Sequence, residues 1–350
     1  MEIFSVFANI GINAKDFNRG IEEAEGRGQS LGSAFLGVSK TIARAGLAIG
    51  ASVKGIGIAA LQVGGQFDSS LRTIEARTGM TAESMGKVGL AFRDLALDGN
   101  FSANEIARSF AYVAVAGQDS TEAIGIMENA MVLAGATGVN LGTAAYFLGN
   151  YLLKVGKDAS YAERYINIFA ETNRQTGIGL LTLQDYLFRA NVTLQSTNIT
   201  GYEASAMFGA LYQAGIRGAN AYSGVENALR SLLVPTEDQI AALDRLYVAR
   251  HDENGQLKDG IDFLLALGHA LGDLEGDTLS YYNALLGSTV AGSAFLGGIV
   301  DIKYTLPYMI DDIREAGDAL NGTGTAFEMA ALKQDTFAGG LGMMRAAGKD

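Results

Sequence analysis

The stretch ALYQAGIRGANAYSGVENALRSLL, residues 210–233, contains two short amphipathic helices separated by a glycine-rich break. Apolar residues recur at i, i+3, i+4 and i+7 and so share one face of the first helix: Met207, Ala210, Leu211 and Ala214. The second helix has an equivalent apolar face: Val225, Ala228, Leu229, Leu232 and Leu233. Between the helices, Gly215 and Gly218 can adopt positive φ angles, which end one helix and redirect the chain. The pattern is typical of a packing and assembly element and contains nothing that resembles an active site.

Arg217 is the single cation inside this break. Its guanidinium could bind an anion or a partner's carboxylate, which would make it a recognition residue. It could equally hydrogen-bond the carbonyls at the end of the preceding helix, or pair with Glu226. We favour the structural role, because the surrounding residues are those of a helix-packing corner.

The composition favours a large helical protein. The chain has 350 residues, of which 48% are hydrophobic, so it can bury a sizeable core. Its two prolines, Pro235 and Pro307, leave long stretches free to be helical. The 46 glycines indicate close helix–helix approach or frequent short breaks. We predict an all-α fold, an array of short packed helices, with a short N-terminal strand in residues 1–12 and one small β-hairpin near residues 247–258.

Charge and residue content exclude several classes of function. Residues 1–100 contain ten Lys/Arg and ten Asp/Glu, so the whole net charge of −12 lies in residues 101–350. Such a surface repels nucleic acid, and we expect no tight nucleic-acid binding. Without cysteine, thiol catalysis, disulfides and cysteine–zinc sites are excluded. His251 and His269 have no HExxH partner, and we expect neither a metal site nor a cofactor.

Four segments are predicted along the chain. Residues 1–30 hold the strand and a charged helix, and residues 31–66 form an apolar segment rich in small residues. Residues 67–300 form a core of short capped helices, and residues 301–350 form a helical tail, interpreted as the truncated start of a longer region.

Helix caps mark the core. Ser102 with Glu105, and Thr200 with Glu203, have the spacing of capping boxes. Further N-cap candidates are Asp119, Asn140, Asp158, Thr182 and Thr236. Alternate helix starts fall roughly 40 residues apart, which suits stacked helix pairs, although the units share no sequence. The many glutamates lie mostly in first turns, where they offset the positive helix end, so we interpret them as structural rather than catalytic.

Two uncharged or nearly uncharged stretches are candidates for membrane contact. Residues 284–300 lack charge but are shorter than the roughly 20 residues needed to span a bilayer. In residues 31–65, Lys54 would cost about 2.5–3.5 kcal/mol near a bilayer centre. A helical protein interior is the favoured interpretation, and conditional insertion remains an alternative.

Five pieces, taken in order, resemble the core region of phage tail tape-measure proteins. They are Phe67-Asp-Ser-Ser-Leu71, Phe101-Ser102-Ala-Asn-Glu105, Val115-Ala116-Gly117, Leu133–Gly138, and Gln213-Ala214-Gly215-Ile216-Arg217-Gly218. The last is the most specific. The resemblance covers about residues 67–300 and makes these residues family markers rather than catalytic ones.

The resemblance implies a structural, non-enzymatic protein of the virion tail. Such a protein occupies the lumen of the tail tube, scaffolds assembly, determines tail length and leaves at DNA ejection. Its expected partners are the tail tube protein, tail assembly chaperones, tail tip proteins and further copies of itself, with the host cytoplasm as the place of assembly. Family members are usually much longer, so we expect this chain to be a head facing the tip or the chaperones rather than the ruler. The alternatives are a membrane-inserting pore component and an unrelated helical interaction module.

Overall fold

The computed structural model describes residues 67, 69–76, 79, 81–98, 101–114 and 120–333. The chain divides into two compact units, Met1–Ser69 and Ser70–Asp350, and almost all described residues belong to the second. The predicted segments 1–30 and 31–66, with the N-terminal strand, lie outside the described residues, as do residues 334–350.

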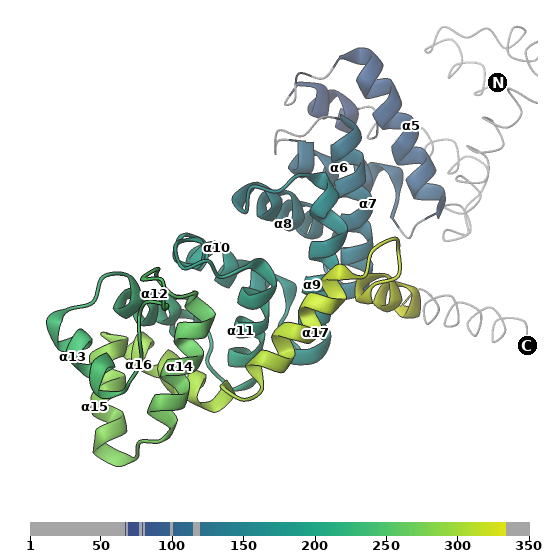
Figure 1. Ribbon diagram of the computed structural model, residues 1–350. Coiled ribbons are helices and arrows are strands. Elements are labelled where there is room, and N and C mark those ends of the chain that lie inside the picture. Colours follow the sequence, from purple (N-terminus) through teal and green to yellow (C-terminus); the bar gives the residue numbers. More distant parts are fainter. Residues whose placement is uncertain are drawn as a thin grey trace, which may run out of the picture. The chain divides into compact units, whose positions relative to one another are not determined.

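In its described part the second unit is built from helices (Figure 1), which confirms the all-α prediction. The chain is helical at residues 69–76 and 325–333. Between them lie α5 (Ala82–Asp98), α6 (Ala103–Ala114), α7 (Ser120–Thr137), α8 (Leu141–Lys154), η1 (Ala159–Tyr161), α9 (Ala162–Thr176), α10 (Leu180–Ser196), α11 (Gly201–Gln213), α12 (Ala219–Leu233), α13 (Glu237–Arg245), α14 (Gly260–Gly272), α15 (Gly276–Gly287), α16 (Val290–Ile302) and α17 (Leu306–Asp318).

Alternate helices pack on one another in the first part of the unit. α6 lies against α8, α7 against α9, and α9 against α11. α6, α8 and α10 begin at residues 103, 141 and 180, close to the predicted spacing of about 40 residues. Aromatic side chains fill the centre: the ring centroids of Phe147 and Phe169 are 4.6 Å apart. The predicted helix-pair spacing is therefore present in the packing.

The caps explain where most of these helices begin. Thr200 and Thr236 form complete capping boxes with Glu203 and Gln239. The side chain of Asn140 caps α8 by accepting the N–H of Thr143. The side chain of Asp158 caps η1 by accepting the N–H of Ser160. The prediction for Thr182 is wrong, because α10 begins at Leu180 after Gly179 and Thr182 lies in the first turn. Asp119 lies outside the described residues.

α16 is the centre of the second part of the unit. It packs against α11, α12, α14 and α15. It approaches α12 closely, since a Cβ built on Gly224 would lie 2.8 Å from the carbonyl oxygen of Ala291. This close approach is one of the two roles expected for the abundant glycines.

The uncharged stretch 284–300 is not one helix. α15 ends at Gly287, Ser288 adopts a left-handed φ of 62°, and Thr289 caps the start of α16. α16 packs in the interior of the unit, as the favoured interpretation expected, whereas the buried residues of α15 are Leu286 and Gly287 at its end. Among the helices that the structure describes, none is long and apolar enough to span a membrane. Residues 31–65 lie outside the described part.

The predicted hairpin is reduced to a single antiparallel bridge between His251 and Leu257. Asn254-Gly255 forms the turn, with Gly255 at a φ of 76°. The N–H of Asp252 donates to the carbonyl of Gln256 at 2.8 Å. The paired segments are too short to count as strands.

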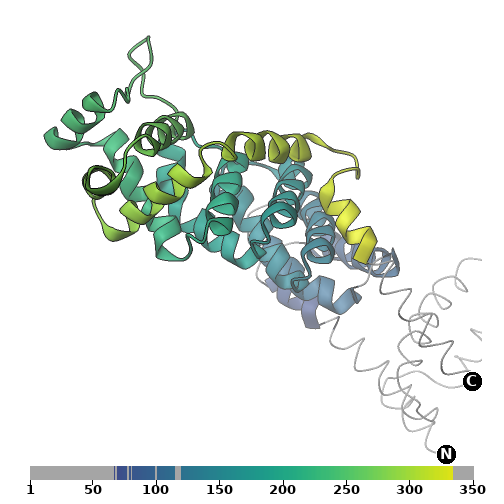
Figure 2. The ribbon, with the colours of Figure 1, turned by 90° about the horizontal axis from the view of Figure 1, so that it is seen from below.

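After α16 the chain turns back along the unit. α17 packs against α11 and α9, so a segment late in the sequence covers helices from its middle (Figures 1 and 2). The helix at 325–333 then reaches α7, where the Cβ of Ala330 lies 3.3 Å from a Cβ built on Gly135. α5 also packs on α7, so α5 and the helix at 325–333 lie against the same helix.

Candidate functional site

The most specific family marker, residues 213–218, forms the corner between α11 and α12. Gly215 has a φ of 85°, and its N–H donates to the carbonyl of Tyr212 at 3.2 Å. The N–H of Ile216 donates to the carbonyl of Leu211 at 2.9 Å. This pair of hydrogen bonds is the Schellman motif, which satisfies the last carbonyls of a helix. Ala214 is the C-cap and is exposed, so the predicted apolar face of α11 ends at Leu211.

Gly218 starts α12 in a conformation that side chains other than glycine rarely adopt. Its φ is 58° and its ψ is −136°. Its N–H donates to the hydroxyl of Tyr186 in α10 at 2.7 Å. The break therefore joins three helices, because α10 holds the point where α11 turns into α12.

Ile216 fixes this corner to the centre of the unit. A Cβ built on Gly298 of α16 would lie 2.7 Å from Cγ1 of Ile216 and 2.8 Å from Cδ2 of Leu211. The hydrophobic pair that accompanies a Schellman motif thus lies against a glycine of the next helix layer. Ile216 is therefore the residue of the AGIRG sequence that packs against α16.

Arg217 points away from this packing. Its side chain is exposed, and the guanidinium carbon lies 4.2 Å above the ring centroid of Tyr212. Within the described residues it makes no ion pair with Glu226 and no hydrogen bond to the end of α11. Stacking on a ring one turn earlier is a cation–π contact that holds the side chain against the corner.

The other marker residues are dispersed. Phe67 is buried, with 6% of its surface exposed. The hydroxyl of Ser102 accepts the N–H of Glu105 at 3.2 Å, the N-cap half of the predicted capping box. Ala116 and Gly117 lie outside the described residues. The structure therefore gathers Ala214, Gly215, Ile216, Arg217 and Gly218 at one corner, and the remaining described markers lie on other elements.

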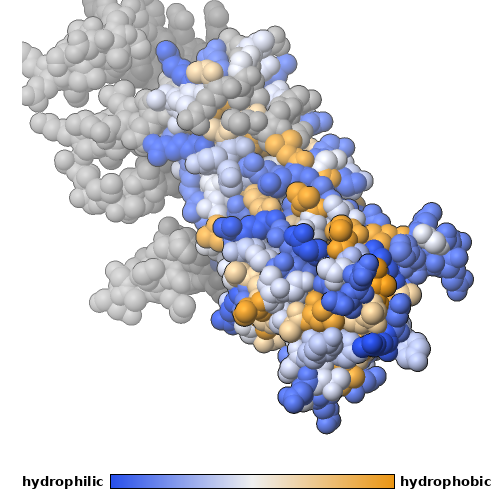
Figure 3. Space-filling view, turned by 90° about the vertical axis from the view of Figure 1, so that its left-hand side faces the viewer, coloured by the Kyte–Doolittle hydropathy of each residue, from blue (hydrophilic) through white to orange (hydrophobic). Residues whose placement is uncertain are grey.

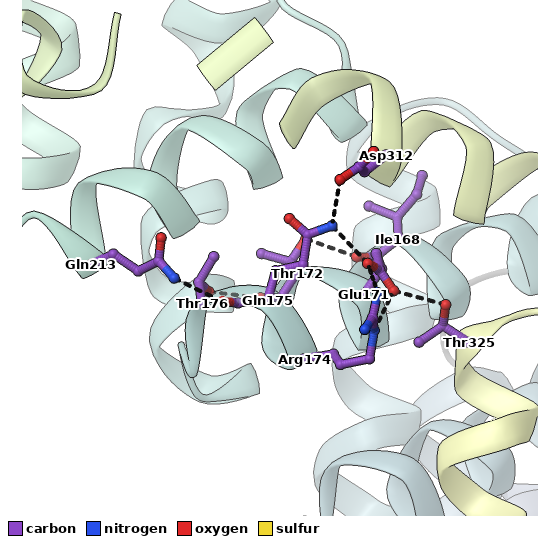
Figure 4. A network of polar contacts seen from close by, with 9 residues as sticks. All are labelled: Ile168, Glu171, Thr172, Arg174, Gln175, Thr176, Gln213, Asp312 and Thr325. Carbon is purple, nitrogen blue, oxygen red and sulfur yellow. Dashed lines mark hydrogen bonds and ion pairs between the residues drawn. The ribbon is translucent and has the colours of Figure 1, made fainter. Parts of the chain in front are cut away.

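A second feature, which the sequence analysis missed, is a row of polar side chains on one face of α9. Glu163, Asn167, Glu171 and Gln175 follow each other at four-residue spacing and so point to the same side of the helix. Each bonds to α17 or to the segment after it. We call these four residues the polar ladder. Figure 4 shows two of them, Glu171 and Gln175, with neighbouring side chains of α9.

Asn167 is the most buried member of the ladder. It has no exposed surface, its Nδ2 donates to the carbonyl of Ala319 at 2.7 Å, and its Oδ1 accepts the N–H of Ala326 at 3.1 Å. One side chain thereby provides a hydrogen-bond partner for a backbone carbonyl at the end of α17 and for a backbone N–H at the start of the helix at 325–333. Glu163 adds a further bond by accepting the N–H of Gly322 at 2.6 Å.

Glu171 carries the buried charge of the ladder. Its Oε2 accepts the hydroxyl of Thr325 at 2.9 Å and Nε of Arg174 at 2.8 Å, and its Oε1 accepts Nε2 of Gln175 at 2.7 Å (Figure 4). Burial raises the pKa of this carboxyl, but the bonds from Arg174, Gln175 and Thr325 outweigh it, so the pKa is below its ordinary value. The carboxylate is therefore ionised and holds the contact as a charge-assisted one.

The chemistry of these sites is that of packing. The described residues contain no group of three or more His, Asp or Glu side chains that could hold a metal. His269 lies against the ring of Tyr304, with centroids 5.1 Å apart, and His251 is exposed beside the turn.

The surface around α13 and α15 has a mixed hydropathy. Its apolar residues lie in small groups among hydrophilic ones (Figure 3).

Comparison with known proteins now identifies the family. The family model described as "Phage-related minor tail protein" matches residues 91–287, more than half of the chain. The chain belongs to this family. The match runs from within α5 to the end of α15 and includes the Schellman corner and the polar ladder. This minor tail protein is thus a structural protein of a phage tail, and the alternative of an unrelated interaction module is excluded.

A curated relative agrees with this assignment. The minor tail protein is 24% identical over 357 residues to the "Tape measure protein" of Pneumococcus phage Dp-1. The alignment covers 99% of this chain and 30% of the relative, so the chain spans about a third of that protein's length. No solved structure matches.

Proposed function

We propose that this minor tail protein is a tape-measure protein that occupies the lumen of the growing tail tube, scaffolds assembly and determines tail length, and that leaves the tube when DNA is ejected. The observation that carries the proposal is the similarity to the tape measure protein of phage Dp-1 over 99% of the chain. The protein acts in the tail and is assembled in the host cytoplasm. Its role is structural, and none of its residues is assigned to catalysis.

The helical fold supports this proposal physically. An α-helix rises about 1.5 Å per residue, so an extended helical chain converts a number of residues into a defined length. The described residues between 70 and 333 instead fold back on themselves, with α17 against α9 and α11. In this proposal the folded unit marks one end of the measured length, and extended helical sequence sets the rest.

The folded unit also offers surfaces for the proposed partners, which are the tail tube protein, the assembly chaperones, the tail tip proteins and other copies of this chain. α17 carries several exposed acidic side chains, including Asp311 and Glu315. Contacts to these partners would therefore be polar and weakened by salt.

An insertion into the phage gene tests the length assignment. We expect 70 helix-forming residues inserted between residues 333 and 334 to lengthen the tail by about 105 Å, because each adds about 1.5 Å. Tail length is measured by electron microscopy of purified virions.

The matched control places the same insertion in the exposed turn at Asn254–Gly255, where it enlarges a loop of the folded unit. We expect that insertion to leave the tail length unchanged. Virions that assemble with the insertion after residue 333 and keep the original tail length would rule out the length-determining role.

A further inference from the structure

The segment that follows α17 is attached to the unit by a set of polar contacts and fully buries few apolar side chains. We call residues 319–333 the strap. Its fully buried apolar side chains are two alanines, Ala326 and Ala330, and Phe327 and Met329 are half-buried, whereas a core helix such as α16 fully buries Phe295, Leu296, Ile299 and Ile302. Because the free energy of burial scales with the apolar area removed from water, the strap gains less from burial than α16 does.

The polar contacts of the strap converge on three members of the ladder. Glu163 accepts the N–H of Gly322, Asn167 bonds the backbone of Ala319 and Ala326, and Glu171 accepts the hydroxyl of Thr325. These directional bonds fasten the strap only at the register in which all are made together. At the far end of the strap, Nζ of Lys333 donates to the carbonyl of Ala136 in α7 at 2.7 Å.

The strap is also packed with little clearance over the ladder. A Cβ built on Gly324 would meet the side-chain amide of Asn167, so glycine is required for the close approach. The turn before it combines two left-handed residues, Asn321 and Gly322, with φ values of 68° and 76°. The strap therefore has a sharp turn at its start, glycine at the point of closest contact and two fully buried alanines, Ala326 and Ala330, after that.

The path of the chain gives the strap a position from which it controls the unit. α5, near the start of the described chain, and the strap, at its end, both lie against α7. While the strap is closed, α8–α17 form a closed loop whose two ends meet. Tension along the chain would first load the strap contacts rather than the packing of α16.

We propose that the strap opens as a unit before the rest of the fold and that Glu163, Asn167 and Glu171 are its latch. Opening frees the end of α17 and separates the strap from α7. The use of this opening in a tail, to let the unit extend when the protein leaves the tube, rests on the proposed function. The latch itself is a property of the isolated chain.

Hydrogen exchange on the full 350-residue chain tests the latch. We expect the amides of residues 326–333 to exchange about 100-fold faster than those of α16, as a separate opening unit does. Asn167→Ala removes two of the latch bonds. In this variant the exchange rate of the strap amides should be about tenfold higher than in the unaltered chain, while the exchange rate in α16 stays the same.

Two further variants keep the test decisive. Thr325→Val removes one hydroxyl contact from the strap itself and should raise strap exchange even if Asn167→Ala does not fold. Asn227→Ala, which removes an intrahelical bond to Ser223 in α12, should leave strap exchange unchanged.

Equal exchange rates in the strap and α16 of the unaltered chain would overturn the proposal, because the strap would then open only with the whole unit. A uniform rise across all helices in Thr325→Val would also overturn it. Neither result would bear on tail length, so failure of the latch and failure of the tape-measure assignment are distinguishable.

Discussion

Gly297 and Gly298 are neighbours in α16 with opposite surroundings. A Cβ on Gly298 would lie 2.7 Å from Ile216, whereas one on Gly297 would meet nothing within 4 Å. We expect Gly298→Ala to destabilise the unit by about 1–3 kcal/mol, since the corner at Ile216 must shift. Gly297→Ala should stabilise it by about 0.5–1 kcal/mol through helix propensity. Urea denaturation of both variants measures this, and equal effects would contradict the described corner.

Asp259 makes stability depend on pH. It caps α14 through the N–H of Ile261, and burial, followed by the charges of Glu203 and Asp262, raises its pKa to about 6. An acid whose pKa is raised on folding stabilises the fold below its unfolded pKa of about 4 and loses that contribution as pH rises through 6. The ionised carboxylate therefore destabilises the fold at pH 8.

Asp259→Asn keeps an N-cap oxygen and removes this charge. We expect the variant to be more stable than the unaltered chain at pH 8, by about 1 kcal/mol after allowance for solvent screening, and about equal at pH 4. Thermal denaturation at the two pH values measures the difference. A stability gain of the same size at both would show that removal of the charge is not its cause.

At the scale of elements, α13 is a short helix with a complete capping box. It runs only from Glu237 to Arg245, and Gln239 closes its capping box while donating to the carbonyl of Leu285 at 3.0 Å. We expect Thr236→Ala to cost about 1 kcal/mol and to raise hydrogen exchange chiefly in α13. Thr236→Ser keeps the hydroxyl and serves as the control. Unaltered protection of α13 in the alanine variant would mean that tertiary contacts alone hold the helix.

Elements whose ends depend on local chemistry could be predicted from the sequence. Gly215, Thr200 and Asn140 act on backbone groups within four residues, so their pattern is sufficient. The break between α15 and α16 within residues 284–300 could not be predicted in the same way, because Ser288 takes a left-handed conformation that its residue type does not favour. The packing of α15 on α16 determines that turn.

The polar ladder could not be predicted, and the reason lies in long-range packing. Polar residues four apart on a helix normally indicate a solvated face. Asn167 and Glu171 are buried because residues more than 150 positions later in the chain cover them. Only the return of α17 shows this, and periodicity within one helix carries no information about it.

At the scale of the whole molecule, the family could be recognised from ordered motifs, and the family match later confirmed it. The described fold adds what those motifs do not contain, namely that the chain folds back and ends its described part beside α7. The predicted boundaries at residues 30, 66 and 300 remain predictions.

A disulfide across the strap should block ejection without blocking assembly. The chain has no cysteine, and a Cβ at Gly135 lies 3.3 Å from that of Ala330, near the spacing that a disulfide requires. In phage carrying Gly135→Cys with Ala330→Cys, the bond cannot form in the reducing host cytoplasm, so tails should assemble normally. After purification and oxidation the strap cannot open, and we expect infectivity to fall at least about tenfold and to return on reduction.

The two single-cysteine phages, oxidised in the same way, are the controls and should remain infectious, because neither can join the strap to α7. DNA release triggered in vitro, followed by nuclease digestion, locates the block at ejection rather than at adsorption. Oxidised double-cysteine virions that form the bond and still release DNA at the original rate would show that the strap stays closed while the protein leaves the tube. The latch would then serve the stability of the folded unit rather than its extension.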